Sequence, residues 1–250
     1  MKETRILMGM PVIVNVVDLS AKKEDIDEIF NYFKYIDEKF STYKDSSEIT
    51  KINKGLIKEK DYSKDMKEIF NLAEKTKKET NGYFDIINNE KKCDPSGVVK
   101  GWAINNAAKL LLKKGFNNFY VEAGGDIQVY GNNENNIPWQ VGIRNPFEPN
   151  KIVKKIFLNN CEGIATSGTY ERGNHVYDPN NRHKKIEKIV AITVIGPNIY
   201  EADRFATAAF AMQEKGINFI ESLKGFEGYV IGDDKTATMT SNFEKYVKSN

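Results

Sequence analysis

The order of helix-like and strand-like patterns constrains this chain most. Apolar residues recur at helical spacing over residues 24–40, 45–53, 63–81 and 97–114. Strand-like patterns dominate from 118 to 196, and helices and strands are mixed again up to a closing hairpin. Blocks of this kind favour an α+β fold over a regular βαβ alternation. We therefore expect mixed, mostly antiparallel sheets flanked by helices.

The patterns within these segments support that interpretation. The first helix has its apolar residues on one face, at Ile26, Ile29, Phe30, Phe33, Ile36 and Phe40. Residues 4–18 are rich in Val, Ile and Met around Pro11, which predicts one or two strands near a sheet edge. Residues 118–130 predict two strands joined by a tight turn at Gly124-Gly125.

Length and charge limit the classes of function. The 250 residues suffice for a single domain over 1–250, or for two closely packed lobes within it. The net charge of +2 gives no sign of a nucleic-acid partner. No run approaches the roughly 20 apolar residues of a membrane span. Because no signal peptide is recognisable, we expect a cytoplasmic protein unless a leader has been removed.

A carboxylate and a hydroxyl share one face of a late helix pattern. Asp203 and Thr207 lie four residues apart in the segment EADRFATA. Oxygen ligands of this kind suit Mg²⁺, which usually keeps room for substrate phosphate. The alternative is an aspartate near a helix start and a threonine bonded to its own helix.

A second candidate phosphate site opens a helix. The segment DPSGVVKG, residues 94–101, offers backbone N–H groups at a helix N-terminus, with Lys100 in the first turn. This is not a Walker loop, and the alternative is a capped helix whose lysine points to solvent.

Two further turns allow close approach of a ligand to the backbone. Gly124 and Gly125 precede Asp126 in EAGGD, although, taken alone, this motif is more often a tight hairpin turn capped by the aspartate. Thr166 and Ser167 end a predicted strand, where hydroxyls can hold phosphate or sugar oxygens. An ordinary strand end is the alternative.

Two ring side chains complete the set of candidates. His175, one of two histidines, precedes Asp178-Pro179 and suits a general base, although a lone histidine is more often structural. Tyr43 is a candidate for stacking on an aromatic ligand, and simple packing is the alternative.

Taken together and in this order, the motifs resemble the FAD:protein FMN transferase family, often called ApbE-like. The matching segments cover nearly the whole chain. They are MGMPVIV (8–14), FSTYKDSSEITKIN (40–53), NGYFD (81–85), DPSGVVKGWAI (94–104), EAGGDI (122–127), WQVGIRNP (139–146), GIATSGTYERGNHVYDP (163–179) and EADRFATAAFAM (201–212).

The resemblance implies an ApbE-like flavin transferase fold and a specific reaction. Such enzymes bind FAD and Mg²⁺ and move the FMN half of FAD onto a threonine or serine hydroxyl of an acceptor flavoprotein, releasing AMP. By motif, Asp203, Thr207 and the Gly97 carbonyl correspond to metal ligands, Asp203 being also catalytic. His175 corresponds to the group that assists deprotonation of the acceptor hydroxyl. The FAD-binding surface corresponds to Met10, Tyr43, Asp85, Lys100, Gly124, Gly125, Asp126, Thr166 and Ser167.

The chain departs from the family pattern after Asp85. Only residues 86–93 separate the FD pair from the DPSGVVKG turn, which predicts a more open side of the FAD site. Two other functions stay open, an FAD pyrophosphatase giving FMN and AMP and a non-catalytic FAD-binding protein. The sequence does not identify the acceptor, the oligomeric state, or the choice between Mg²⁺ and Mn²⁺.

Overall fold

A single antiparallel sheet organises the molecule. The computed structural model describes residues 1–88, 90–159, 161–169, 178–181 and 186–247. Eight strands form the sheet in the order β1-β2-β3-β4-β7-β8-β9-β10, and each neighbouring pair is antiparallel. Their bounds are β1 Lys2–Leu7, β2 Met10–Val16, β3 Phe119–Ala123, β4 Asp126–Tyr130, β7 Gly163–Gly168, β8 Ile189–Gly196, β9 Glu227–Gly232 and β10 Ala237–Met239. The predicted α+β class with mostly antiparallel strands is confirmed.

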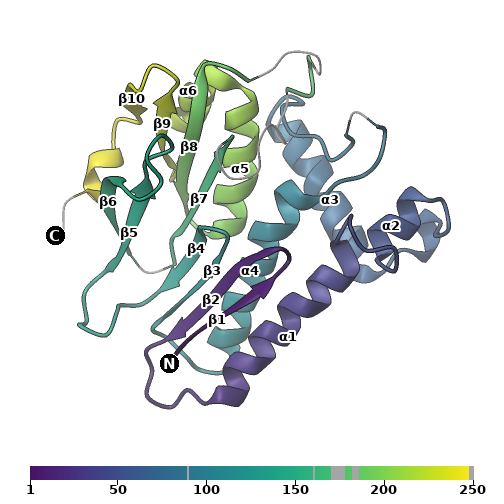
Figure 1. Ribbon diagram of the computed structural model, residues 1–250, viewed down its shortest axis with the longest axis horizontal. Coiled ribbons are helices and arrows are strands. Elements are labelled where there is room, and N and C mark those ends of the chain that lie inside the picture. The colour runs from purple at the N-terminus through teal and green to yellow at the C-terminus, as the bar shows by residue number, and fades with distance from the viewer. Residues whose placement is uncertain (89, 160, 170–177, 182–185, 248–250) are drawn as a thin grey trace.

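Helices cover one face of this sheet (Figure 1). They are α1 Lys23–Phe40, α2 Glu48–Asn53, α3 Lys64–Glu79, α4 Ser96–Lys113, α5 Ile199–Ala211 and α6 Gly216–Ser222, with short 3-10 turns at Glu59–Asp61, Gln213–Lys215 and Phe243–Tyr246. All six apolar residues predicted for the inner face of α1 are buried. Helix α5 is buried almost all round, which fits a position between α4, α6 and the sheet.

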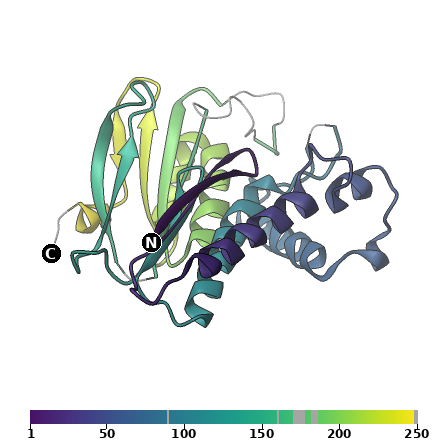
Figure 2. The ribbon, with the colours of Figure 1, turned by 60° about the horizontal axis from the view of Figure 1, so that its bottom comes forward.

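A two-stranded hairpin lies on the other face of the sheet (Figure 2). Strand β5, Trp139–Arg144, pairs antiparallel with β6, Ile152–Leu158. Its inward side chains and those of the outer sheet face form a second, smaller core, with Trp139, Ile156 and Phe243 among its members. The part of the sheet beneath the hairpin is therefore buried between it and the helical layer.

Side-chain caps set helix starts that differ slightly from those predicted. Ser47 Oγ accepts from Thr50 N, so α2 begins at Glu48 and not at Asp45. Asn198 Oδ1 accepts from Glu201 N, so α5 begins two residues earlier than predicted. Asp203 therefore lies beyond the first turn of α5, which removes the simple interpretation of a helix-start aspartate.

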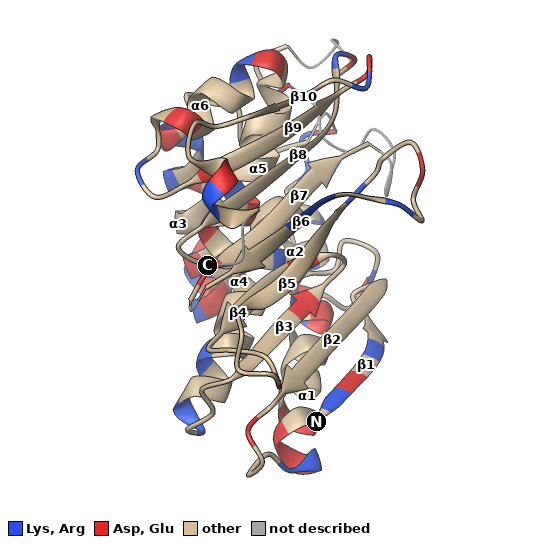
Figure 3. Ribbon diagram, turned by 90° about the vertical axis from the view of Figure 1, so that its left-hand side faces the viewer, with Lys and Arg blue, Asp and Glu red and all other residues tan. Residues whose placement is uncertain are grey.

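Charged side chains gather on the outer helices and loops, and the central strands carry few (Figure 3). This distribution fits strands β4, β7, β8 and β9, whose residues are mostly buried, whereas alternate residues of β1 and β2 are partly or fully exposed. None of the helices in the described part of the chain is both long and apolar enough to cross a bilayer.

Candidate functional site

A cavity of about 470 Å³ opens where the sheet meets helices α4 and α5. The β1–β2 turn, the loop after α3, the β3–β4 turn and the end of β7 complete its walls. Its size lies within the range of small-molecule sites, roughly 300–1,000 Å³. Ten of the predicted site residues line it, namely Met10, Asp85, Gly97, Lys100, Gly124, Gly125, Thr166, Ser167, Asp203 and Thr207.

Two glycines bring the helices α4 and α5 together at the floor of this cavity. A Cβ on Gly101 would lie 2.7 Å from Asp203 Cβ and 2.9 Å from the Ile199 carbonyl oxygen. A Cβ on Gly97 would lie 3.3 Å from Thr207 Cγ2. Glycine at these two positions, one turn apart, therefore lets α5 place Asp203 and Thr207 directly against the first turns of α4.

The sheet fixes the start of α5 in turn. Gln128 Oε1 in β4 accepts a hydrogen bond from Ile199 N at 2.7 Å. This buried side chain of the sheet thus pairs with a backbone N–H group at the helix start, which has no partner within the helix. Gly163 in β7 also has no room for a Cβ, which would lie 2.0 Å from Ile199 N. These contacts hold α5 against β4 and β7 and thereby set the position of Asp203.

Buried charges meet where α4, α5 and β4 converge. Lys100 Nζ lies 2.7 Å from Asp126 Oδ2 and 3.7 Å from Asp203 Oδ1. Asp203 Oδ2 accepts from Gly101 N at 2.8 Å, and Asp126 Oδ1 accepts from Thr166 N at 3.1 Å. Lys100 therefore does not point freely into solvent, and Asp126 does more than complete a hairpin turn.

Burial of this cluster changes the acidity of Asp203. Asp203 is 3% exposed, and its burial raises the pKa of its carboxyl above the ordinary value. The positive charge of Lys100 opposes that rise in pKa, whereas the Asp126 carboxylate adds to it. Two buried carboxyl groups thus face one ammonium group, so a cation beside Asp203 would favour its ionised form.

Glycines shape the opposite wall of the cavity. Gly124 and Gly125 have φ of +58° and +91°, values that favour glycine. A Cβ on Gly124 would also lie 2.9 Å from Met10 Sδ, so the β3–β4 turn packs closely against β2. Backbone groups of this turn are therefore accessible to a ligand in the cavity.

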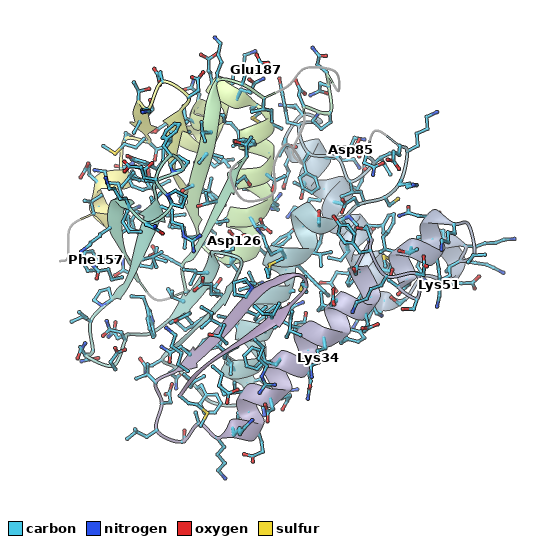
Figure 4. All side chains as sticks on the ribbon, viewed as in Figure 1. Lys34, Lys51, Asp85, Asp126, Phe157 and Glu187 are labelled. Carbon is cyan, nitrogen blue, oxygen red and sulfur yellow. The ribbon has the colours of Figure 1, made fainter. Side chains whose placement is uncertain are left out.

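The loop after α3 supplies the third wall. Asp85 accepts from Ile87 N at 2.9 Å through Oδ1, and its Oδ2 lies 2.9 Å from Lys77 Nζ. These two contacts fix its carboxylate at the cavity. Figure 4 labels Asp85 on this loop and Asp126 in the sheet, so the two carboxylates come from separate elements.

Three predicted residues are not among the described residues that line this cavity, namely Asp126, Tyr43 and His175, although Asp126 contacts Lys100 at its wall. Tyr43 is 98% exposed and does not line it, so its stacking role stays a prediction. His175 lies outside the described residues, and its role as proton acceptor also stays a prediction.

The cavity also has residues to which the sequence assigned no role. Glu122 and Arg144 line it together with the residues named above. The pairing of β5 with β6 shifts register between Ile143 and Arg144, and such bulges redirect side chains. Arg144 lies in the segment WQVGIRNP, where its place at a strand end before Asn-Pro was the available signal.

Among the described residues, carboxylates alone supply only some of the ligands that a hard divalent cation needs. Among the described residues no three His, Cys, Asp or Glu side chains cluster as a metal centre. A cation at this place would therefore need neutral oxygens such as the Thr207 hydroxyl and the Gly97 carbonyl beside Asp203. The position of two buried carboxyl groups, Asp126 and Asp203, beside a single ammonium group is the observation that favours such a cation.

Comparison with known proteins identifies the family and the fold of the chain. The sequence profile of the ApbE family matches residues 8–90 and 87–230. The chain belongs to the ApbE family. ApbE structures share its fold throughout: the flavin transferase ApbE from Vibrio cholerae has a TM-score of 0.85 at 20% identity, covering 98% of each chain. The ApbE protein from Thermotoga maritima gives 0.86 at 19% identity, covering 99% of each chain.

Curated relatives of the chain are named FAD:protein FMN transferase. The protein from Vibrio cholerae is 31% identical over 138 residues, which cover 52% of this chain and 41% of that protein. The protein from Escherichia coli K12 is 29% identical over 167 residues, covering 62% of this chain and 48% of that protein. The matched regions thus span less than half of these relatives' length.

Proposed function

We propose that this chain is an Mg²⁺-dependent FAD:protein FMN transferase. It transfers the FMN half of FAD to a threonine or serine hydroxyl of an acceptor flavoprotein and releases AMP. The observation that carries this proposal is that residues from α4, α5 and the β3–β4 turn line one cavity. The relatives named for this activity support the same reaction.

The chain's own groups suit a dinucleotide diphosphate. Ser96 N, Val98 N and Gly124 N already donate hydrogen bonds within the protein, so the backbone donors that we propose for phosphate oxygens are Gly97 N and Gly125 N. Lys100 supplies a positive charge beside them, and Asp126 holds that charge in place. Little covalent chemistry is then left to the protein, because its main task is to hold the phosphorus atom in line with the attacking hydroxyl.

Asp203 and Thr207 are the side chains proposed to hold Mg²⁺, together with the Gly97 carbonyl. This assignment is supported by two observations: all three residues line the cavity, and a Cβ on Gly97 would lie only 3.3 Å from Thr207 Cγ2. When bound, the ion neutralises charge on the diphosphate and on the departing AMP phosphate.

The bond changes of the reaction are those of a phosphoryl transfer. The acceptor oxygen forms a bond to the phosphorus of the FMN half, and the bond from that phosphorus to the AMP oxygen breaks. AMP leaves with the electron pair, and the hydroxyl proton passes to a base, for which His175 is our candidate.

Mass spectrometry after incubation with FAD and Mg²⁺ tests the proposal. The probes are candidate acceptor flavoproteins encoded near this chain's gene, with a reaction lacking acceptor as control. We expect the mass of FMN on a threonine or serine, and we expect Asp203→Ala to abolish its formation. Free FMN and AMP without acceptor would instead indicate a pyrophosphatase, and unchanged FAD in all reactions would indicate a non-catalytic binding protein.

A further inference from the structure

A second cavity lies beside the first, on the outer face of the sheet. It measures about 280 Å³ and lies between β5 and the strands β3, β4 and β7. The two cavities share five lining residues, namely Glu122, Gly124, Gly125, Arg144 and Thr166. They therefore meet at the β3–β4 turn, next to the place proposed for the diphosphate.

We propose that this second cavity receives an extended segment of the acceptor protein. That segment runs beside β5 and delivers its threonine or serine hydroxyl to the first cavity at the shared residues. The inference rests on the proposed function, because it assigns the polypeptide substrate of the same site.

The chemistry of the second cavity suits side chains. Trp139 and Tyr120 meet edge to face at 5.1 Å between ring centroids at one end. Val141 and Ile143 of β5 continue the apolar wall. The volume falls below the roughly 300–1,000 Å³ of small-molecule sites, so it fits one or two apolar side chains better than a dinucleotide.

The backbone of β5 offers a second means of binding. Within the described residues β5 belongs to a two-stranded sheet with β6, so its other edge carries no strand. That edge faces the side of β3, β2 and β1, where no helix covers the outer sheet face (Figure 3). Extended peptides commonly bind by adding a strand to an edge of this kind.

The length of β5 sets the spacing that we expect between the hydroxyl residue and an apolar residue in the acceptor segment. Trp139 begins β5 and Arg144 ends it at the shared part of the cavities. Six residues of strand span roughly 17 Å between the first and last Cα. An extended acceptor segment with its hydroxyl residue beside Arg144 therefore places an apolar residue about five positions away against Trp139 and Tyr120.

Charge separates the two ends of this path. Arg144 and Glu122 mark the junction, whereas the far end is aromatic. Charged side chains at the junction disfavour an apolar side chain there, whereas the aromatic end favours one. The acceptor segment is thus oriented with its hydroxyl residue toward the diphosphate.

A pair of matched variants tests the proposal. Val141→Asp places a carboxylate in the second cavity, whereas Val153→Asp places one on β6, where Val153 is 37% exposed and lines neither cavity. The probes are short synthetic peptides, each with one threonine and randomised flanks, selected on the FAD-loaded protein with Mg²⁺. Fluorescence anisotropy gives peptide affinity, flavin fluorescence gives FAD affinity, and mass spectrometry detects FMN on the peptide.

We expect selected peptides to carry an apolar residue near the predicted spacing. Val141→Asp should weaken their binding at least about tenfold and leave FAD affinity unchanged, while Val153→Asp changes neither. Should Val141→Asp fail to fold, a benzophenone-bearing peptide replaces it as the test. It should cross-link to residues 139–144 of the unaltered protein.

Three results would overturn the inference: no peptide is selected, Val141→Asp binds peptides as the unaltered protein does, or cross-links lie only outside the second cavity. A folded Val141→Asp variant that loses FAD affinity would show that the cavity holds part of FAD, which also overturns it. Peptides that bind through the second cavity without acquiring FMN would contradict the proposed transferase and leave the docking path intact.

Discussion

At the scale of single residues, the buried carboxylate of Asp203 lowers the stability of the metal-free fold, and the same carboxylate is the group that we propose as a metal ligand. Its carboxyl is buried, accepts one hydrogen bond from Gly101 N, and lies near a second buried carboxylate, Asp126. Charged groups in such surroundings are destabilising unless they are compensated. A bound cation provides that compensation, so the metal-free protein should carry a measurable penalty at this position.

The variant Asp203→Asn should therefore stabilise the metal-free protein. Its amide oxygen keeps the hydrogen bond from Gly101 N, and the charge that burial disfavours is removed. Because one unit of pKa shift corresponds to about 1.4 kcal/mol, we expect a gain of at least about 1 kcal/mol in the free energy of unfolding at pH 8. Denaturant unfolding with a chelator present measures it. A loss of stability in that experiment would show that the Asp203 carboxylate is already well compensated.

The same residue predicts how stability depends on pH. The folded-state pKa of Asp203 is raised, so between its ordinary value and that raised value the folded chain keeps a proton that the unfolded chain has released. The stabilising contribution of the protonated group is thus present at acid pH and lost as pH rises through this window. Melting temperatures of the chelated protein and of Asp203→Asn, compared from pH 5 to pH 8, should diverge steadily as pH rises. Parallel curves would contradict the raised pKa.

At the scale of elements, the close contact of α4 with α5 positions the proposed metal ligands. Gly101→Ala would bring a Cβ within 2.7 Å of Asp203 Cβ, so one of the helices must move. We expect a loss of about 1–3 kcal/mol of stability and weaker Mg²⁺-dependent FAD binding. Lys109→Ala, on the exposed side of α4, is the control and should change neither. Unaltered FAD binding in a folded Gly101→Ala protein would show that the spacing of these helices does not matter for the site.

Much of this element-level arrangement could be predicted from local pattern. Helical spacing identified the inner face of α1, and the four-residue interval of Asp203 and Thr207 placed them on one side of α5. The pairing of Lys100 with Asp126 and the role of Gln128 at the start of α5 were not predictable in this way. These contacts join residues far apart in sequence, and no periodicity or turn signal encodes which distant partner a side chain meets.

At the scale of the whole molecule, one cavity collects groups from both ends of the chain. Its walls run from the β1–β2 turn to α5, so a dinucleotide bound there contacts segments separated by nearly two hundred residues. Ligand binding to such a site is linked to the stability of the entire fold. The resemblance of the motifs led to the proposed site, whereas the sequence did not indicate the second cavity beside β5, on which we base the docking path.

Binding of FAD and of Mg²⁺ should therefore be coupled. If the ion bridges the diphosphate and Asp203, FAD should bind at least about tenfold more tightly with Mg²⁺ than with a chelator. Isothermal titration of FAD in the two conditions measures this ratio, and Asp203→Ala should reduce it to one. Lys92→Ala, on an exposed loop, is the control and should keep the full ratio. If the unaltered protein bound FAD equally well in the two conditions, FAD binding would not be coupled to Mg²⁺ binding, which would contradict the prediction.

The crystal structure of the protein with FAD and Mn²⁺ tests the convergence of these segments most directly. Anomalous scattering locates Mn²⁺, which accepts the same oxygen ligands as Mg²⁺. We predict one peak that contacts Asp203, Thr207 and the Gly97 carbonyl, with the FAD diphosphate beside it and beside the Gly124-Gly125 turn. A peak elsewhere, or a diphosphate outside this cavity, would contradict the proposed site.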